Sequence, residues 1–149
     1  MDKINKTRTA YNFRNICHKC FNDIEFPLLG DFAEGEIIFQ TKDAKDFYIA
    51  VLIDNKSLDF IIDFLKQDKN FKEDNTAVSQ RMLALIADKV DNKELTTDFP
   101  ICPICKSRQR SFGDGNRTTQ IELRFASWSH FESLTQERKL IKLKEVINL

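Results

Sequence analysis

The sequence predicts an α+β fold in a single domain, residues 1–149, in which a small antiparallel sheet is packed by about three helices. Three observations predict this class. Several short segments have strand-like apolar patterns, three longer segments have helical periodicity, and two Cys-x-x-Cys pairs stand 81 residues apart. A chain of this length buries about 68–70% of the surface that its unfolded form exposes, which is enough for a core of its own.

The N-terminal segment is expected to be mostly extended. Residues 1–10 are polar, and we expect them to be loose. Residues 11–16 indicate a short strand that leads into the first cysteine pair. Residues 21–29 continue extended, with Pro27 and Gly30 as breakers.

Two strands follow in the next part of the chain. Residues 36–40 indicate a short one. Residues 47–53 read Phe-Tyr-Ile-Ala-Val-Leu-Ile and are apolar at every position, whereas a strand with one solvated face would alternate. This pattern predicts a central strand that is covered on both sides.

Two helices are predicted after the central strand. The first runs to about residue 67 with Asp54 or Ser57 as its N-cap, because Leu, Ile and Phe repeat there at helical spacing. The second begins at Asn75 or Thr76 and runs to about residue 90. Residues 91–97 are expected to be a linker into the second cysteine pair.

The C-terminal part is expected to hold a β-hairpin and a last helix. Residues 107–112 and 117–127 flank Gly-Asp-Gly-Asn, which is a turn signal between two strands. Apolar and polar residues alternate cleanly along the second arm. Thr135 is expected to cap a final helix that runs to about residue 147.

The four cysteines form a pattern that is typical of a metal site. Zinc in a structural site takes four tetrahedral ligands, and a Cys-x-x-Cys pair presents two sulfurs to one ion from a tight turn. The pairs use every cysteine in the chain, and we expect one structural Zn²⁺ to be bound by Cys17, Cys20, Cys102 and Cys105.

Around the two pairs, Ile16-Cys17-His18-Lys19-Cys20-Phe21 and Ile101-Cys102-Pro103-Ile104-Cys105-Lys106, the chain resembles zinc-ribbon proteins. The resemblance covers the knuckles at 17–20 and 102–105 and the hairpin that follows the second. It implies a split zinc ribbon with an inserted α/β subdomain over about 30–95. It implies no particular activity, because such ribbons bind nucleic acids, bind proteins or serve as scaffolds.

A redox role is the alternative for the cysteines. The Cys102–Cys105 pair alone looks like a glutaredoxin-type dithiol, but such a pair needs a following helix N-terminus to lower the thiol pKa. Residues 106–113 are polar and soon interrupted by glycine, and no proline follows Pro103. Zinc is therefore favoured over redox chemistry, and over four unrelated thiols.

Few catalytic arrangements fit the composition, and we expect no enzymatic activity. The chain has two histidines, no Gly-x-Ser-x-Gly turn and no phosphate-binding glycine loop. His18 and His130 are expected to make hydrogen bonds or packing contacts, not to bind the metal. Glu122, Arg124 and Asp114 faintly resemble part of a metal-dependent nuclease site, but the same residues suit the solvent face of a strand.

The net charge is zero, but the charges are segregated. Residues 1–20 carry a net charge of +4, residues 21–101 carry −8, and residues 102–149 carry +4. We expect the basic residues of both ends to gather near the metal. They would bind phosphate backbones there or offset the −2 charge of a zinc tetrathiolate. The members are Lys3, Lys6, Arg8, Arg14, Lys19, Lys106, Arg108, Arg110 and Arg117.

The acidic middle predicts a surface that contacts a basic protein or keeps the protein soluble. Its members are Asp43, Asp46, Asp54, Asp59, Asp63, Asp68, Glu73, Asp74, Asp88 and Asp91. We expect a non-enzymatic protein-binding module, such as a bacterial immunity protein that neutralises a basic toxin. The alternative is a nucleic-acid-binding regulator that acts through Arg108, Arg110 and the N-terminal basic residues.

No apolar run approaches the ~18 residues of a membrane helix, and the N-terminus lacks the pattern of a secretory signal. We therefore expect a cytoplasmic protein without membrane partners. In that compartment cysteines more often bind metals than form disulfides.

Overall fold

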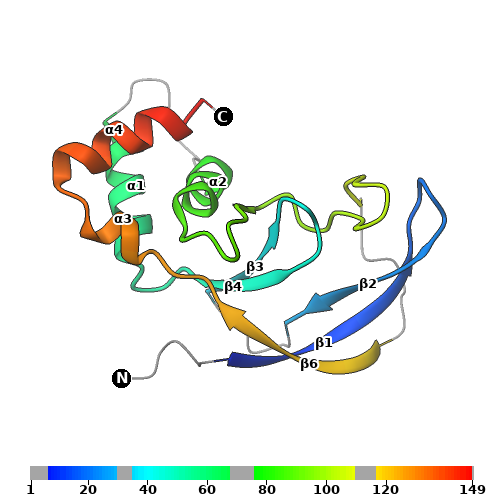
Figure 1. Cartoon of the computed structure of the whole chain (residues 1–149). Helices are drawn as coiled ribbons and strands as arrows, with labels where there is room; N and C mark the ends of the chain where they lie inside the picture. The colour runs from blue at the N-terminus through cyan, green and yellow to red at the C-terminus, as the bar shows by residue number, and fades with distance from the viewer. Residues whose placement is uncertain (1–6, 30–34, 68–75, 110–116, 149) are drawn as a thin grey trace.

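The computed structural model describes residues 7–29, 35–67, 76–109 and 117–148, and it confirms the α+β class. The described chain forms a six-stranded sheet and four helices (Figure 1). The strands lie in the order β2-β1-β6-β4-β3-β5, and the sheet is mixed because β4 and β6 are parallel. They are β1 Thr7–Ile16, β2 Asp23–Leu28, β3 Glu36–Thr41, β4 Phe47–Val51, β5 Leu95–Thr96 and β6 Arg117–Phe125.

Strand β4 lies inside the sheet, and residues 48–50 are buried on both faces, as the apolar run predicts; the strand ends at Val51, two residues earlier than expected. Tyr48 and Ala50 belong to the large cluster that the helices cover. Ile49 belongs to a second cluster, with Ala10 of β1 and Leu123 of β6. In the strand order, β4 and β3 lie between β6 and β5, so the segment expected to be inserted contributes two neighbouring strands to the same sheet as β1 and β2.

The sheet curls so that β2 approaches β4, although β1 and β6 separate them in strand order. The rings of Phe26 on β2 and Phe47 on β4 pack edge to face with centroids 6.2 Å apart. Phe99 contacts both rings, at 5.9 Å from Phe26 and 5.7 Å from Phe47. This small aromatic cluster packs with buried Ile24, Cys17 and Cys102, and so forms the floor of the cysteine site.

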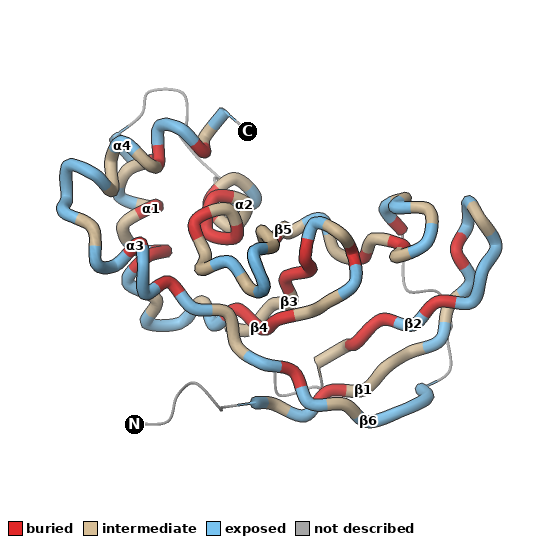
Figure 2. The backbone as a smooth tube through the Cα atoms, in the orientation of Figure 1, coloured by how far each residue is buried: buried red, intermediate tan, exposed pale blue. Residues whose placement is uncertain are grey.

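Four helices gather at the end of the molecule away from the β1–β2 turn (Figure 1). Figure 2 shows their buried sides turned toward one another and toward β3 and β4. The apolar stripe that helical spacing gives each longer helix is therefore buried by helix-to-helix and helix-to-sheet packing. The helices are α1 Lys56–Lys66, α2 Thr76–Ile86, α3 Ser129–Ser133 and α4 Gln136–Val146.

The cap of α4 is as predicted, and the cap of α1 is not. Thr135 accepts a hydrogen bond from the Arg138 amide at 3.2 Å. At α1 the cap is Asn55, whose side chain accepts from Leu58 N at 3.0 Å. Asp54 has a φ of +55°, and Ser57 is buried inside the helix, so neither has the extended conformation of an N-cap.

Helix α2 ends at Ile86, four residues earlier than expected. The chain turns at Asp88, whose carboxylate accepts from Ser127 Oγ at 2.6 Å and from the amides of Ser129 and His130 at 2.9 and 3.0 Å. Asp88 therefore binds the backbone amides at the N-terminal end of α3. The expected linker that follows contains β5, which pairs with β3.

The predicted hairpin between 107–112 and 117–127 is wrong. Strand β6 pairs with β1 on one side and with β4 on the other, so both of its edges bind strands that are distant in the sequence. Of the first arm, the described residues 107–109 make one bridge, from Arg108 to Ile101, and 110–116 lie outside the described residues. The sheet is accordingly larger than expected and not purely antiparallel.

Strand β1 is longer than expected, since Thr7–Ile16 includes four residues of the segment predicted to be loose. Pairing with β6 begins at Thr7, which fixes this part of the chain. Pro27 does not break β2, because β2 is an edge strand, which is where a sheet tolerates proline. Gly30 and residues 1–6 lie outside the described residues.

None of the helices in the described ranges combines the length and the apolar character that crossing a membrane requires.

We predict that Asp88→Ala lowers the free energy of unfolding by about 2 kcal/mol, because three donors at the start of α3 lose a charged acceptor. Burial raises the pKa of Asp88, but the bonds from Ser127, His130 and Ser129 outweigh it, so the net pKa is lowered. The contribution is therefore complete above the ordinary carboxyl pKa and is lost as pH falls through the lowered value. Urea titrations at neutral and acid pH should show the difference between variant and parent shrinking in acid. The exposed Asp63→Ala is the control and should change stability by less than about 0.5 kcal/mol; equal effects of both variants would contradict the assignment.

Candidate metal centre

The fold brings all four predicted ligands together. The thiol sulfurs of Cys17, Cys20, Cys102 and Cys105 all lie within 4.8 Å of one another. The first two come from the β1–β2 turn, and the others come from the segment that follows β5. Cys17 and Cys102 are buried, and the other two are half-buried. We call residues 16–22 and 101–109 together the metal pole.

The two knuckles have the same backbone geometry. The amide of Phe21 donates to Cys17 O at 2.9 Å, and the amide of Lys106 donates to Cys102 O at 2.9 Å. A second bond closes each turn, from Cys17 N to Asn22 O and from Cys102 N to Ser107 O. The residue after each second cysteine is left-handed, with φ of +60° at Phe21 and +63° at Lys106. The repeated Cys-x-x-Cys spacing therefore encodes a repeated turn.

The sulfur positions fit a tetrahedral ion. Four thiolates at about 2.3 Å from one ion would lie about 3.8 Å from each other. Cys17 and Cys105 are 3.5 Å apart, and Cys20 and Cys102 are 3.8 Å apart. A disulfide would bring two sulfurs to about 2.05 Å, and all four cysteines are free. The site could therefore hold a metal ion.

Hydrogen bonds favour the thiolate form in the first knuckle. Burial raises the pKa of Cys17, but amide donors from Cys20 and Lys19 and the side chain of Gln109 outweigh it and lower that pKa to about 5. The backbone and side chain of Asn22 lower the pKa of Cys20. Thiolate is the form that binds metals, so this knuckle is prepared for an ion.

The second knuckle is different at Cys105. The Ser107 amide lowers the pKa of this thiol, but burial and the three neighbouring cysteines raise it to about 11. A divalent cation bound among the sulfurs would lower the pKa of Cys105, because its positive charge stabilises each thiolate directly. The cluster is therefore electrostatically suited to a cation.

Gln109 joins the two knuckles and was not predicted from the sequence. Its buried amide donates to Cys17 Sγ at 3.2 Å and to Ser107 O at 3.1 Å. Its carbonyl oxygen accepts from the His18 amide at 3.4 Å and lies 3.3 Å from His18 Nδ1. His18 is thus a hydrogen-bonding residue with an exposed position and not one of the clustered ligands, as expected. No spacing rule marks Gln109, because its partners come from both knuckles.

A second buried glutamine fixes the other side of the second knuckle. The side chain of Gln40 on β3 donates to Ile101 O and accepts from Ile101 N, both at 2.8 Å. The same amide donates to Ala44 O at 3.1 Å in the β3–β4 turn. The side chain of Gln40 thus makes the two hydrogen bonds with Ile101 that the backbone of a neighbouring strand would make.

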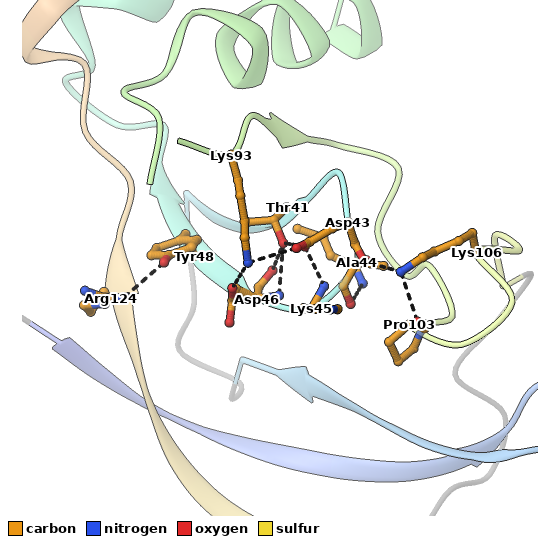
Figure 3. Close-up of polar contacts among 11 residues, drawn as sticks. Thr41, Asp43, Ala44, Lys45, Asp46, Tyr48, Lys93, Pro103, Lys106 and Arg124 are labelled. Atoms are coloured by element: carbon orange, nitrogen blue, oxygen red, sulfur yellow. Dashed lines mark hydrogen bonds and ion pairs between the residues drawn. The ribbon is translucent and has the colours of Figure 1, made fainter. Parts of the chain in front are cut away.

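The β3–β4 turn also contacts the second knuckle through charged groups (Figure 3). Lys106 Nζ donates to Asp43 O and to Pro103 O. Lys93 lies between two carboxylates of the turn, at 2.9 Å from Asp43 and 3.2 Å from Asp46. Hydrogen bonds from Thr41 and Lys93 hold the pKa of Asp43 well below its usual range. These two acidic residues therefore support the turn.

The expected gathering of basic residues at the metal is only partly present. Arg14 pairs with Asp23 at 2.6 Å, and Arg108 lies 4.0 Å from Asp98. Arg8 pairs with Glu36 and stands at the far end of β1, about 30 Å along the strand from Cys17. Lys19 is exposed. Lys3, Lys6 and Arg110 lie outside the described residues.

The acidic middle is also divided. Asp43, Asp46 and Asp88 make the structural contacts given above. Asp54, Asp59 and Asp63 are exposed around α1, and Asp91 is exposed near β5. Asp68, Glu73 and Asp74 lie outside the described residues.

The residues weighed for catalysis lie apart from the metal centre. Glu122 on β6 accepts hydrogen bonds from Thr7 and Thr9 on β1, at 3.1 and 2.7 Å. Arg124 donates to the Tyr48 hydroxyl at 3.0 Å. Both side chains are exposed, and Asp114 lies outside the described residues. His130 is exposed on α3, where its backbone amide contacts Asp88.

Comparison with protein-family models, with curated proteins and with solved structures finds no match to this chain. The resemblance to zinc ribbons therefore rests on the knuckles alone, and inferences about function rest on the geometry of the site and the surface.

We predict that Gln109→Ala weakens metal binding by about 10–100-fold, the usual effect of removing a residue that orients a metal ligand. Competition with a chromophoric chelator measures this affinity. Gln109→Glu should weaken binding at least as much, since it replaces the donor to Cys17 with a carboxylate. The exposed Gln120→Ala on β6 is the control. Affinities within twofold of the parent for both Gln109 variants would contradict the role.

Proposed function

We propose that this chain is a non-enzymatic, zinc-stapled protein-binding module. The closed cluster of four cysteine sulfurs carries the proposal. Four thiols at tetrahedral spacing match the ligand set of structural Zn²⁺, and they leave no position open for water or substrate. Four reduced cysteines suit the reducing conditions of the cytoplasm.

The proposed partner is a basic protein that binds the acidic face of α1, which we define as Asp54, Asp59 and Asp63. All three are exposed, and the described residues offer none of them an ion pair. Carboxylates of this kind attract a basic partner over a distance and accelerate its association. An inhibitor, such as an immunity protein that neutralises a basic toxin, would use this property.

The nucleic-acid alternative has less support. Exposed Lys19 favours it. Arg14 and Arg108 are paired with aspartates, however, and Arg8 stands far from the metal. A phosphate backbone would compete with these carboxylates for the same cations.

We predict one zinc ion per chain, measured by elemental analysis of the purified protein. Cys102→Ser should lower this ratio and destabilise the fold. Structural zinc contributes roughly 10–16 kcal/mol of binding free energy, so chelation should unfold at least the metal pole. Circular dichroism before and after chelation follows this change; full removal of metal with an unaltered melting curve would contradict a structural role.

We predict that Asp59→Lys with Asp63→Lys slows association with the basic partner, most strongly at low salt. Exposed charges act over about 8 Å at physiological ionic strength, and they seldom affect stability much. Stopped-flow association with a basic protein retained by the immobilised chain measures the effect. Glu137→Lys is the matched control, because Glu137 lies in the first turn of α4 as Asp59 lies in the first turn of α1; zinc content should stay unchanged, and both variants should lower the melting temperature only slightly. Retention of nucleic acid instead, lost with Arg108→Glu and Arg110→Glu, would favour the alternative.

A further inference from the structure

Large apolar side chains are exposed beside the metal ligands. Phe21 is 77% exposed, Ile16 is 61% exposed and Ile104 is 58% exposed. Each of the three is adjacent in sequence to a ligand cysteine. Single exposed apolar residues are ordinary on protein surfaces. Three that flank the ligands of one site, one of them aromatic, are unusual. We call Ile16, Phe21 and Ile104 the knuckle tip.

The backbone of Phe21 makes its residue type unexpected. The turn requires a left-handed residue after its second cysteine, as the φ values at Phe21 and Lys106 show. Glycine adopts this conformation without steric cost, whereas a bulky side chain does so only against a steric penalty. Phenylalanine therefore stands where the fold by itself favours glycine.

The equivalent residue of the other knuckle has a structural reason to be there. Lys106 uses its side chain to bind Asp43 O and Pro103 O, which ties the second knuckle to the β3–β4 turn. For Phe21 the described residues provide no ring contact, and most of its surface meets solvent. Packing thus explains Lys106 and does not explain Phe21.

We propose that Phe21 is the anchor of a docking surface, formed by the knuckle tip, for a folded protein that presents an apolar pocket edged by carboxylates. The β1–β2 turn projects from the end of the molecule, so it suits insertion into a concave partner (Figure 1). The hydrogen-bonded knuckle fixes the backbone of Phe21 before binding, which reduces the backbone entropy lost on association. Exposed Lys19, two residues away, supplies a cation for the edge of the pocket.

Charge and composition favour a protein over a nucleic acid as the occupant. Sequence-independent binding of single-stranded nucleic acids uses several aromatic platforms among free cations. The knuckle tip has one aromatic and two aliphatic side chains, and the nearby Arg14 and Arg108 are paired with aspartates. Buried aromatic anchors are typical of protein interfaces. This surface lies at the opposite end of the molecule from α1, so it is independent of the proposed acidic face (Figure 1).

The test uses the full-length, zinc-loaded chain with the photocrosslinker p-benzoylphenylalanine in place of Phe21, irradiated in cells of the source organism. The same group in place of Ile141, an exposed apolar residue on α4, is the matched control. We expect one protein to be crosslinked from position 21 and not from position 141. That protein is then identified by mass spectrometry, purified, and titrated against variants of the chain.

Phe21→Gly should weaken this affinity at least tenfold, and Lys19→Glu should weaken it less, while Ile141→Ala leaves it unchanged. Phe21→Gly should also keep its zinc and melt at the same temperature as the parent or higher, because glycine suits the left-handed turn. An affinity that Phe21→Gly leaves unchanged overturns the proposal. So does crosslinking to nucleic acid, to a second copy of this chain, or to no discrete partner.

Discussion

The cluster of four thiols is the constraint on which the metal pole depends. It joins segments that lie 82 or more residues apart, for example Cys20 and Cys102, and so closes the β1–β2 turn onto the chain that leaves β5. The apolar cluster beneath it is small, with Ile24 and Phe26 as its buried members besides the cysteines. Burial of so little surface supplies limited free energy, and bonds to a metal would supply the rest.

Two buried glutamine side chains fix the conformation of the metal pole. Gln40 fixes the residue before Cys102, and Gln109 contacts Cys17 and the first knuckle from the chain beyond Cys105. A buried amide without partners would be costly, so each glutamine stabilises one arrangement of its neighbours over others. The ligands are thereby positioned by β3, β1 and the second knuckle together.

The two ends of the molecule differ in how their charges are used. Near the metal pole and the β3–β4 turn, Arg14, Lys93 and Lys106 contact carboxylates or carbonyls. Around α1 the carboxylates remain exposed to solvent. Charges that are grouped in the sequence are therefore used in two ways in the folded chain. Some make ion pairs and hydrogen bonds within the protein, and the carboxylates around α1 are exposed.

The sequence by itself determined the features that depend on neighbouring residues. The cysteine spacing predicted the ligand cluster, the apolar run predicted that β4 is covered on both faces, and Thr135 predicted the start of α4. Only the tertiary structure decided that β6 pairs with β1 and β4, that Asp88 binds the first turn of α3, and that Gln109 contacts Cys17. Turns, caps and periodicity are encoded within a few residues. Strand partners and buried hydrogen bonds are chosen among groups far apart in the chain, and the choice exists only once the fold brings those groups together.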